Sequence, residues 1–105
     1  MKFRVLFTTE AKEQLAELES RPALAIRFKA VLKCLVLIEN NIRHPGLQTH
    51  KYDGLEAPNG QDMFEAYAQN RTPGAYRVFW HYGPGKGQIT IFPSPRTLEN
   101  NRATY

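Results

Sequence analysis

The spacing of hydrophobic residues divides the chain into helical and extended segments. Apolar residues recur every three or four positions from residue 9 to Ser20 and again over residues 22–40, which is the spacing of amphipathic helices. Elsewhere apolar and polar residues alternate, which is typical of half-buried strands. The predicted strands cover residues 2–8, 62–70, 75–82 and 88–92. The resulting element order is β-α-α-β-β-β.

Capping and turn residues mark the ends of these segments. A hydroxyl of Thr8 or Thr9 is suited to cap the first helix, and Pro22 is suited to start the second. Between the second helix and the following strand, residues 47–61 show weak periodicity and several turn signals. This region is therefore predicted to be a loop, with a short extended piece at residues 50–52.

Two helices followed by a strand meander predict one α+β domain over residues 1–105, with both helices packed on one face of an antiparallel sheet. Residues 96–105 form a predicted polar tail. On one side of the third predicted strand the residues are larger and more apolar, so we expect them to face the helices. They are Tyr76, Val78, Trp80 and Tyr82. The other side, with Arg77, Phe79 and His81, is then expected to face solvent together with Glu65 and Tyr67 of the preceding strand.

Composition narrows the class of protein. The net charge of +4 and the pI near 9.4 favour a polyanion or an acidic protein as partner. The chain has one cysteine, Cys34, which we expect to be a buried core residue; a single cysteine forms no internal disulfide and favours a reducing cytoplasm. No apolar run approaches the ~20 residues that a membrane-spanning helix needs, so no membrane association is expected.

The solvent-facing side of the sheet carries candidate chemistry. Arg77 and His81 are four residues apart and share one face of a strand. A hairpin loop of residues 71–75 pairs Glu65 with His81 and Gln69 with Arg77, at the ~5 Å separation of directly opposed side chains. This register places a carboxylate, an imidazole and a guanidinium on one surface.

Such a set suits cleavage of RNA at its own 2′-hydroxyl, which needs a base, an acid and a cation. A Glu–His pair can supply the proton transfers, each contributing ~10²–10⁴-fold, and an arginine fork matches phosphate oxygens. No metal or cofactor is expected, because His44, His50 and His81 are scattered without nearby acidic partners. The same residues also fit an ordinary cross-strand pair with Arg77 lying over an apolar neighbour. Both interpretations stay open on the residues alone.

Three pieces of sequence resemble the RelE/ParE superfamily of bacterial type II toxins. HKYDG at residues 50–54 is similar to the family's Lys-x-x-Gly segment, and GAYRVFWHY at 74–82 is similar to its Gly-x-Tyr-Arg strand. A later strand is followed by a basic, tyrosine-bearing tail. RHPGLQTHKY at residues 43–52 also resembles the branch of cytotoxic translational repressors.

The resemblance implies a cytoplasmic toxin that a cognate antitoxin neutralises. RelE-like members cleave mRNA in the ribosomal A site without a metal or cofactor, which implies mRNA and the ribosome as partners. ParE-like members instead inhibit DNA gyrase, and a non-catalytic relative that only binds an antitoxin is the third possibility. An open sheet edge at residues 2–8 or 88–92 is the expected docking line for the antitoxin.

The resemblance also implies roles for individual residues. Arg77 matches the family's phosphate-contacting strand arginine, and Glu65 and His81 are the expected acid–base residues. Lys51 matches the lysine before the sheet, whereas Pro93 and Pro95 interrupt the pattern in the tail. The expected RNA-contacting residues are Arg43, His50, Lys51, Tyr67, Arg96 and Tyr105. Glu65 departs from the basic residues that RNase members carry on this strand.

Overall fold

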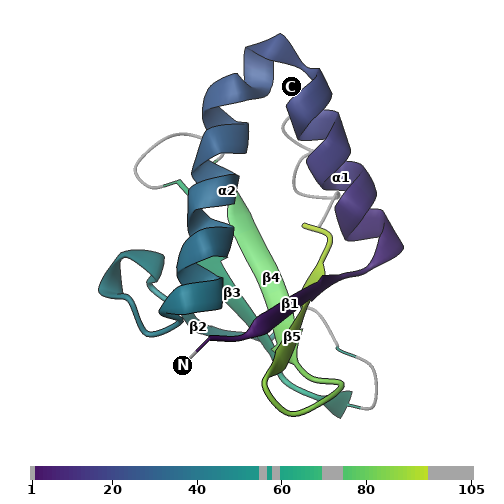
Figure 1. The fold of residues 1–105 in the computed structure, drawn as a ribbon, viewed down its shortest axis with the longest axis vertical. Helices are drawn as coiled ribbons and strands as arrows, with labels where there is room; N and C mark the ends of the chain where they lie inside the picture. Colours follow the sequence, from purple (N-terminus) through teal and green to yellow (C-terminus); the bar gives the residue numbers. More distant parts are fainter. Residues whose placement is uncertain (1, 55–56, 58–59, 70–74, 95–105) are drawn as a thin grey trace.

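The structure is a computed structural model that describes residues 2–54, 57, 60–69 and 75–94. The expected tail, with Arg96 and Tyr105, lies outside the described residues. The described part is an α+β fold in which two helices cover one face of a five-stranded sheet (Figure 1). The helices are α1 (Thr9–Ser20) and α2 (Ala25–Asn40), with short 3₁₀ turns at Pro22–Leu24 and Pro45–Leu47. The strands are β1 (Arg4–Phe7), β2 (His50–Tyr52), β3 (Met63–Tyr67), β4 (Arg77–Tyr82) and β5 (Gln88–Phe92).

The strand order is β1-β5-β4-β3-β2, and the expected antiparallel pairing holds from β2 to β5. One pair departs from the expectation, because β1 runs parallel to β5. Residues 88–92 are therefore an interior strand rather than an open edge, and the sheet's two edges are β1 and β2. The three-residue β2 corresponds to the extended piece that the sequence places at residues 50–52.

Local signals explain how the helices begin. The Thr8 hydroxyl accepts a hydrogen bond from the backbone N–H of Ala11 at 3.0 Å, so Thr8, and not Thr9, caps α1. Pro22 opens a 3₁₀ turn instead of the helix itself, and α2 begins three residues later, at Ala25. The two helices meet the sheet through their apolar stripes.

The main core lies between the helices and the sheet. Trp80, Ile38 and Ile89 are fully buried in it, and the expected inward side of β4 is confirmed by burial of Tyr76, Val78 and Trp80 in this cluster. Cys34 is buried in the same core, as expected, and burial raises the pKa of its thiol to about 12.

The opposite sheet face is less open than the sequence suggests. Phe79 is 2% exposed and packs with Met63 and Ala57 in a second small cluster. Ala57 follows β2 in the sequence, and its side chain covers part of this face. The expectation that the whole face meets solvent is therefore wrong around Phe79.

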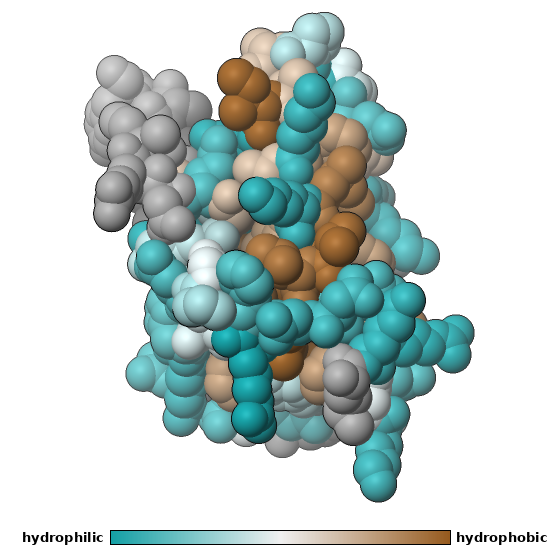
Figure 2. Space-filling view, turned by 60° about the vertical axis from the view of Figure 1, so that its left-hand side comes forward, coloured by the Kyte–Doolittle hydropathy of each residue, from teal (hydrophilic) through white to brown (hydrophobic). Residues whose placement is uncertain are grey.

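Several apolar side chains remain on the outer side of α2. Ile26 is 80%, Val36 56% and Leu32 39% exposed. Figure 2 brings this side of the molecule forward and shows apolar surface in patches separated by hydrophilic side chains. Within the described residues, neither helix has the length and apolar character that crossing a membrane requires.

Candidate functional site

The register of the central hairpin decides which polar side chains meet. Glu65 lies opposite Phe79, and Tyr67 lies opposite Arg77. The predicted pairs of Glu65 with His81 and of Gln69 with Arg77 are therefore wrong by two residues. Because strand side chains alternate with a period of two, such a shift keeps every residue on its expected face and changes only its neighbours. Glu65 consequently needs another imidazole if it is to form an acid–base pair.

His50 on β2 provides that imidazole. It lies directly opposite Glu65, and its Nε2 forms a short hydrogen bond with Glu65 Oε1. Its Nδ1 lies 2.8 Å from the backbone carbonyl oxygen of Gln48. A carbonyl oxygen only accepts, so Nδ1 carries a hydrogen; when Glu65 is ionised, Nε2 carries one as well. With an ionised Glu65, the geometry thus pairs an imidazolium with a carboxylate.

Arg77 lies beside the second oxygen of the Glu65 carboxylate. Its Nη1 lies 3.5 Å from Glu65 Oε2, an ion-pair distance that is too long for a good hydrogen bond. Glu65 Oε2 accordingly has no hydrogen-bond partner among the described residues. Arg77 is not opposite Glu65 but diagonal to it, a separation that a long side chain can span. Oε2 is thus an acceptor that a donor group of a bound molecule can use once the guanidinium moves.

Burial and charge distinguish this cluster from an ordinary surface pair. The Glu65 side chain is 3% exposed, whereas His50 is 46% and Arg77 39% exposed. A buried carboxylate without cationic partners is strongly disfavoured. Formal charges of +1 on His50, +1 on Arg77 and −1 on Glu65 sum to +1. The cluster therefore presents two half-exposed cations to solvent above one buried anion.

Tyr67 lies between the two cations. The Arg77 guanidinium carbon is 4.9 Å from the centre of the Tyr67 ring, and the His50 ring meets that ring edge-on at a centroid distance of 5.8 Å. Cation–π contact restricts the Arg77 side chain. We refer below to His50, Glu65, Tyr67 and Arg77 as the β2–β4 cluster.

The other predicted site residues lie elsewhere. His81 is 7% exposed; its Nδ1 is 2.9 Å from the Tyr82 carbonyl oxygen and its ring packs on Phe92. The expectation that its imidazole projects into solvent beside Arg77 is wrong, because the ring is buried against Phe92 at the border of the second apolar cluster. Lys51 forms an exposed ion pair with Asp62 at 3.3 Å.

The predicted RNA contacts are divided between locations. His50 and Tyr67 belong to the β2–β4 cluster, whereas Lys51 alternates with His50 along β2 and so points to the opposite sheet face. Arg43 is exposed between α2 and the turn at Pro45–Leu47. No group of three histidine, cysteine, aspartate or glutamate side chains in the described ranges is placed to hold a metal ion.

Sequence reasoning placed His50 among RNA contacts and missed it as the partner of Glu65. The signal was present in the short extended piece at residues 50–52. Treating this piece as a strand beside residues 62–70 brings His50 onto the same sheet as Glu65. Only the structure supplies the register that sets them opposite each other.

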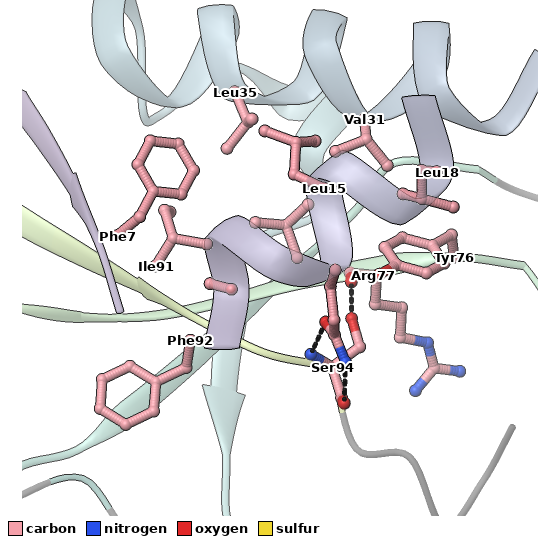
Figure 3. Close-up of a pocket in the computed structure, with 13 residues that line it drawn as sticks. Phe7, Leu15, Leu18, Val31, Leu35, Tyr76, Arg77, Ile91, Phe92 and Ser94 are labelled. Carbon is pink, nitrogen blue, oxygen red and sulfur yellow. Dashed lines mark hydrogen bonds between the residues drawn. The ribbon is translucent and has the colours of Figure 1, made fainter. Parts of the chain in front are cut away.

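An apolar groove opens next to the cluster, between α1 and the ends of β4 and β5 (Figure 3). Leu15, Val31 and Tyr76 are among the side chains that line it. At its rim, Gln14 accepts a hydrogen bond from the Ser94 N–H at 2.8 Å and donates one to the Ser94 carbonyl at 3.1 Å. The Gln14 amide thus fixes the backbone where it leaves β5.

Of three comparisons with known proteins, the one with solved structures finds a similar fold. No family model matches the chain, and no curated protein matches it. A chain in the crystal structure of the archaeal RelE–RelB complex from Pyrococcus horikoshii OT3 matches with a TM-score of 0.59 and 20% sequence identity. The match covers 91% of this chain and 97% of that chain. The protein therefore has a RelE-like fold, as its sequence predicted.

Proposed function

We propose that the protein is the toxin of a toxin–antitoxin pair and that it cleaves mRNA on the ribosome without a metal. The RelE-like fold supports the first part, since the similar solved chain comes from a complex of RelE with RelB. The observation that carries the second part is the β2–β4 cluster. It sets a buried carboxylate, a half-exposed imidazolium and a half-exposed guanidinium within contact of one another.

In the proposed reaction Arg77 binds the scissile phosphate and stabilises charge on the phosphorane. Its movement onto the phosphate uncovers Glu65 Oε2, which takes the proton of the attacking 2′-hydroxyl. Once that proton has neutralised the carboxylate, His50 Nε2 separates from Oε1 and donates its own proton to the leaving 5′-oxygen. The products are a 2′,3′-cyclic phosphate and a 5′-hydroxyl. When the protonated carboxyl group contacts Nε2 again, it returns the proton to the neutral imidazole, which resets the pair.

Physical properties of the cluster favour a phosphodiester as substrate. Two cations above one anion attract a negatively charged chain, and the planar guanidinium matches two phosphate oxygens. Tyr67 offers an aromatic surface between them on which a nucleobase can stack. Its position beside Arg77 pairs base contact with phosphate contact.

The antitoxin needs a surface of its own. The edge strand β1 leaves its outer side unpaired by any described strand, as expected for residues 2–8, and an extended segment can add to such an edge. The exposed apolar residues of α2, with Lys29 and Lys33 on the same helix, suit an amphipathic acidic segment. We assign both surfaces to the antitoxin.

The test uses purified protein and ribosomes translating a defined mRNA. The wild type is expected to give RNA fragments ending in 2′,3′-cyclic phosphate. His50→Gln and Arg77→Gln are each expected to lower the cleavage rate at least ~10²-fold, the size of one proton-transfer or one preorganised electrostatic contribution. Lys12→Gln, which removes one charge from an exposed position on α1, is the control and keeps full activity.

Two outcomes would defeat the proposal. Full cleavage by both cluster variants removes the site, and intact mRNA with the wild type removes the nuclease activity. A DNA supercoiling assay then separates a gyrase inhibitor from a domain that only binds an antitoxin. Growth arrest with DNA damage and no loss of translation indicates the inhibitor.

A further inference from the structure

A second recess lies at the C-terminal end of α2, on the other side of the turn that precedes His50. Arg43, His44, Gln48, Thr49 and Tyr82 contribute to its lining, and it encloses about 690 Å³ including the solvent at its mouth. No acidic side chain is among the described residues that line it. The recess combines an exposed cation, hydrogen-bonding groups and an aromatic ring, which are the components of a nucleotide-binding surface.

Tyr82 is the aromatic component, and two other aromatic rings pack against it. Tyr82 is 40% exposed. It is the last residue of β4 and lies on the core-facing side of that strand. The Phe64 ring meets it edge-on at a centroid distance of 5.2 Å, and the Phe3 ring lies 5.8 Å away. A ring supported by two others loses little freedom when a base stacks on its open surface.

Two groups at the recess are suited to phosphate. Arg43 is exposed and forms no ion pair with any described residue. His44 Nδ1 accepts a hydrogen bond from the Gly46 N–H at 2.9 Å. A backbone N–H only donates, so the hydrogen of the ring lies on Nε2, which is left as a donor. Gly46 makes this contact possible, because a Cβ at that position would lie 3.0 Å from the His44 ring.

One residue, Gln48, lies beside both the recess and the β2–β4 cluster, although Tyr82 and Glu65 lie on opposite faces of the sheet. Gln48 lines the recess, and its carbonyl oxygen is the group that holds His50 Nδ1. Gln48 adopts a left-handed conformation, with φ of 50°, which non-glycine residues seldom take. This turn lets Gln48 contribute to both places, so a chain bound at His50 would reach the recess by passing around the edge strand β2.

We propose that this recess is a second RNA subsite, which binds another nucleotide of the same RNA. Tyr82 stacks on its base, and Arg43 and His44 Nε2 bind its phosphate. The inference rests on the proposed function, since it takes RNA as the target. It adds a binding surface outside the cluster and assigns Tyr82 and His44 a role in substrate affinity.

Binding of a labelled RNA hexamer with 2′-O-methyl groups tests this subsite, because the blocked hydroxyls prevent cleavage. Fluorescence anisotropy of the wild type gives the reference Kd. Tyr82→Leu is expected to weaken binding roughly 5- to 100-fold, the range for loss of one stacked base. Tyr82→Phe keeps the ring and is expected to stay within about 3-fold of the wild type, which separates stacking from damage to the fold.

Charge is tested with a matched pair of variants. Arg43→Gln is expected to weaken binding and to lower the slope of log Kd against log salt concentration by about 1. Lys12→Gln removes the same charge from an exposed position on α1 and is expected to leave both quantities unchanged. Wild-type affinity in Tyr82→Leu and Arg43→Gln, or no RNA binding by the wild type, overturns the subsite.

The two proposals fail differently. If Tyr82→Leu weakens binding but the wild type cleaves no mRNA, the subsite stands and the nuclease activity falls. If His50→Gln abolishes cleavage while Tyr82→Leu binds and cleaves like the wild type, the subsite alone is wrong.

Discussion

Replacing Glu65 with glutamine tests how the buried charge in the β2–β4 cluster is balanced. Glu65→Gln keeps the shape of the side chain and removes the anion between His50 and Arg77. Each cation then lacks its partner. The variant therefore measures what the carboxylate contributes to folding, separately from its proposed role in catalysis.

The exposure of the two cations sets the expected magnitude. Removing one partner of a fully buried ion pair costs ~3–5 kcal/mol, because the remaining charge is held away from water. Here the remaining charges sit on side chains that are 46% and 39% exposed, so water can solvate them. Glutamine also avoids the desolvation of a carboxylate. We therefore expect Glu65→Gln to lower the free energy of unfolding by only about 1–2 kcal/mol.

Urea denaturation followed by tryptophan fluorescence measures this change, since Trp80 is fully buried and reports on the core. Asp62→Asn is the matched control, because the Lys51–Asp62 pair has side chains 57% and 59% exposed. We expect it to cost less than about 0.5 kcal/mol. Equal stability of the two variants, or a loss in Glu65→Gln above about 4 kcal/mol, would refute the reasoning.

Two further predictions concern the core and the end of β5. Burial raises the pKa of the Cys34 thiol from 9.0 to about 12, so the unfolded chain loses this proton first as pH rises. Stability should then fall by about 1.4 kcal/mol per pH unit above pH 9, and Cys34→Ala should lack this component in denaturation measured from pH 8 to 11. Gln14→Leu removes both hydrogen bonds to the Ser94 backbone and should cost about 1–2 kcal/mol. Hydrogen exchange at the Ser94 amide should become faster in that variant, and unchanged exchange would contradict the role assigned to Gln14.

The sequence predicted the helices, the strands and the faces of β4 because these follow from local periodicity. Alternation alone separates Arg77 from Trp80, whatever the neighbouring strand is. The parallel pairing of β1 with β5 is different in kind. It joins segments more than 80 residues apart, and no local pattern specifies which strand a chain end will meet.

The site was predicted only partly, because its contacts also depend on which strands pair and in which register. Glu65 and Arg77 share a face by alternation, but a two-residue change in the hairpin register replaces the imidazole beside Glu65. Burial of His81 also depends on Phe92, against which its ring packs and which borders the second apolar cluster. The apolar side chain of Phe79 on the supposedly open face was the signal that this surface needed cover.

The position of His50 links catalysis to the stability of the sheet edge. β2 is only three residues long and pairs with β3 alone among the described strands. The bond between His50 and Glu65 joins these two strands, so the proposed acid–base pair is also one of the contacts that keep β2 in place. Edge strands with few buried contacts open more easily than central ones. Opening of β2 would separate the imidazole from the carboxylate and release the Gln48 carbonyl together with the recess behind it. Proton transfer and binding at the second subsite are therefore expected to depend on the same local equilibrium, which RNA bound across both places would shift toward the closed edge.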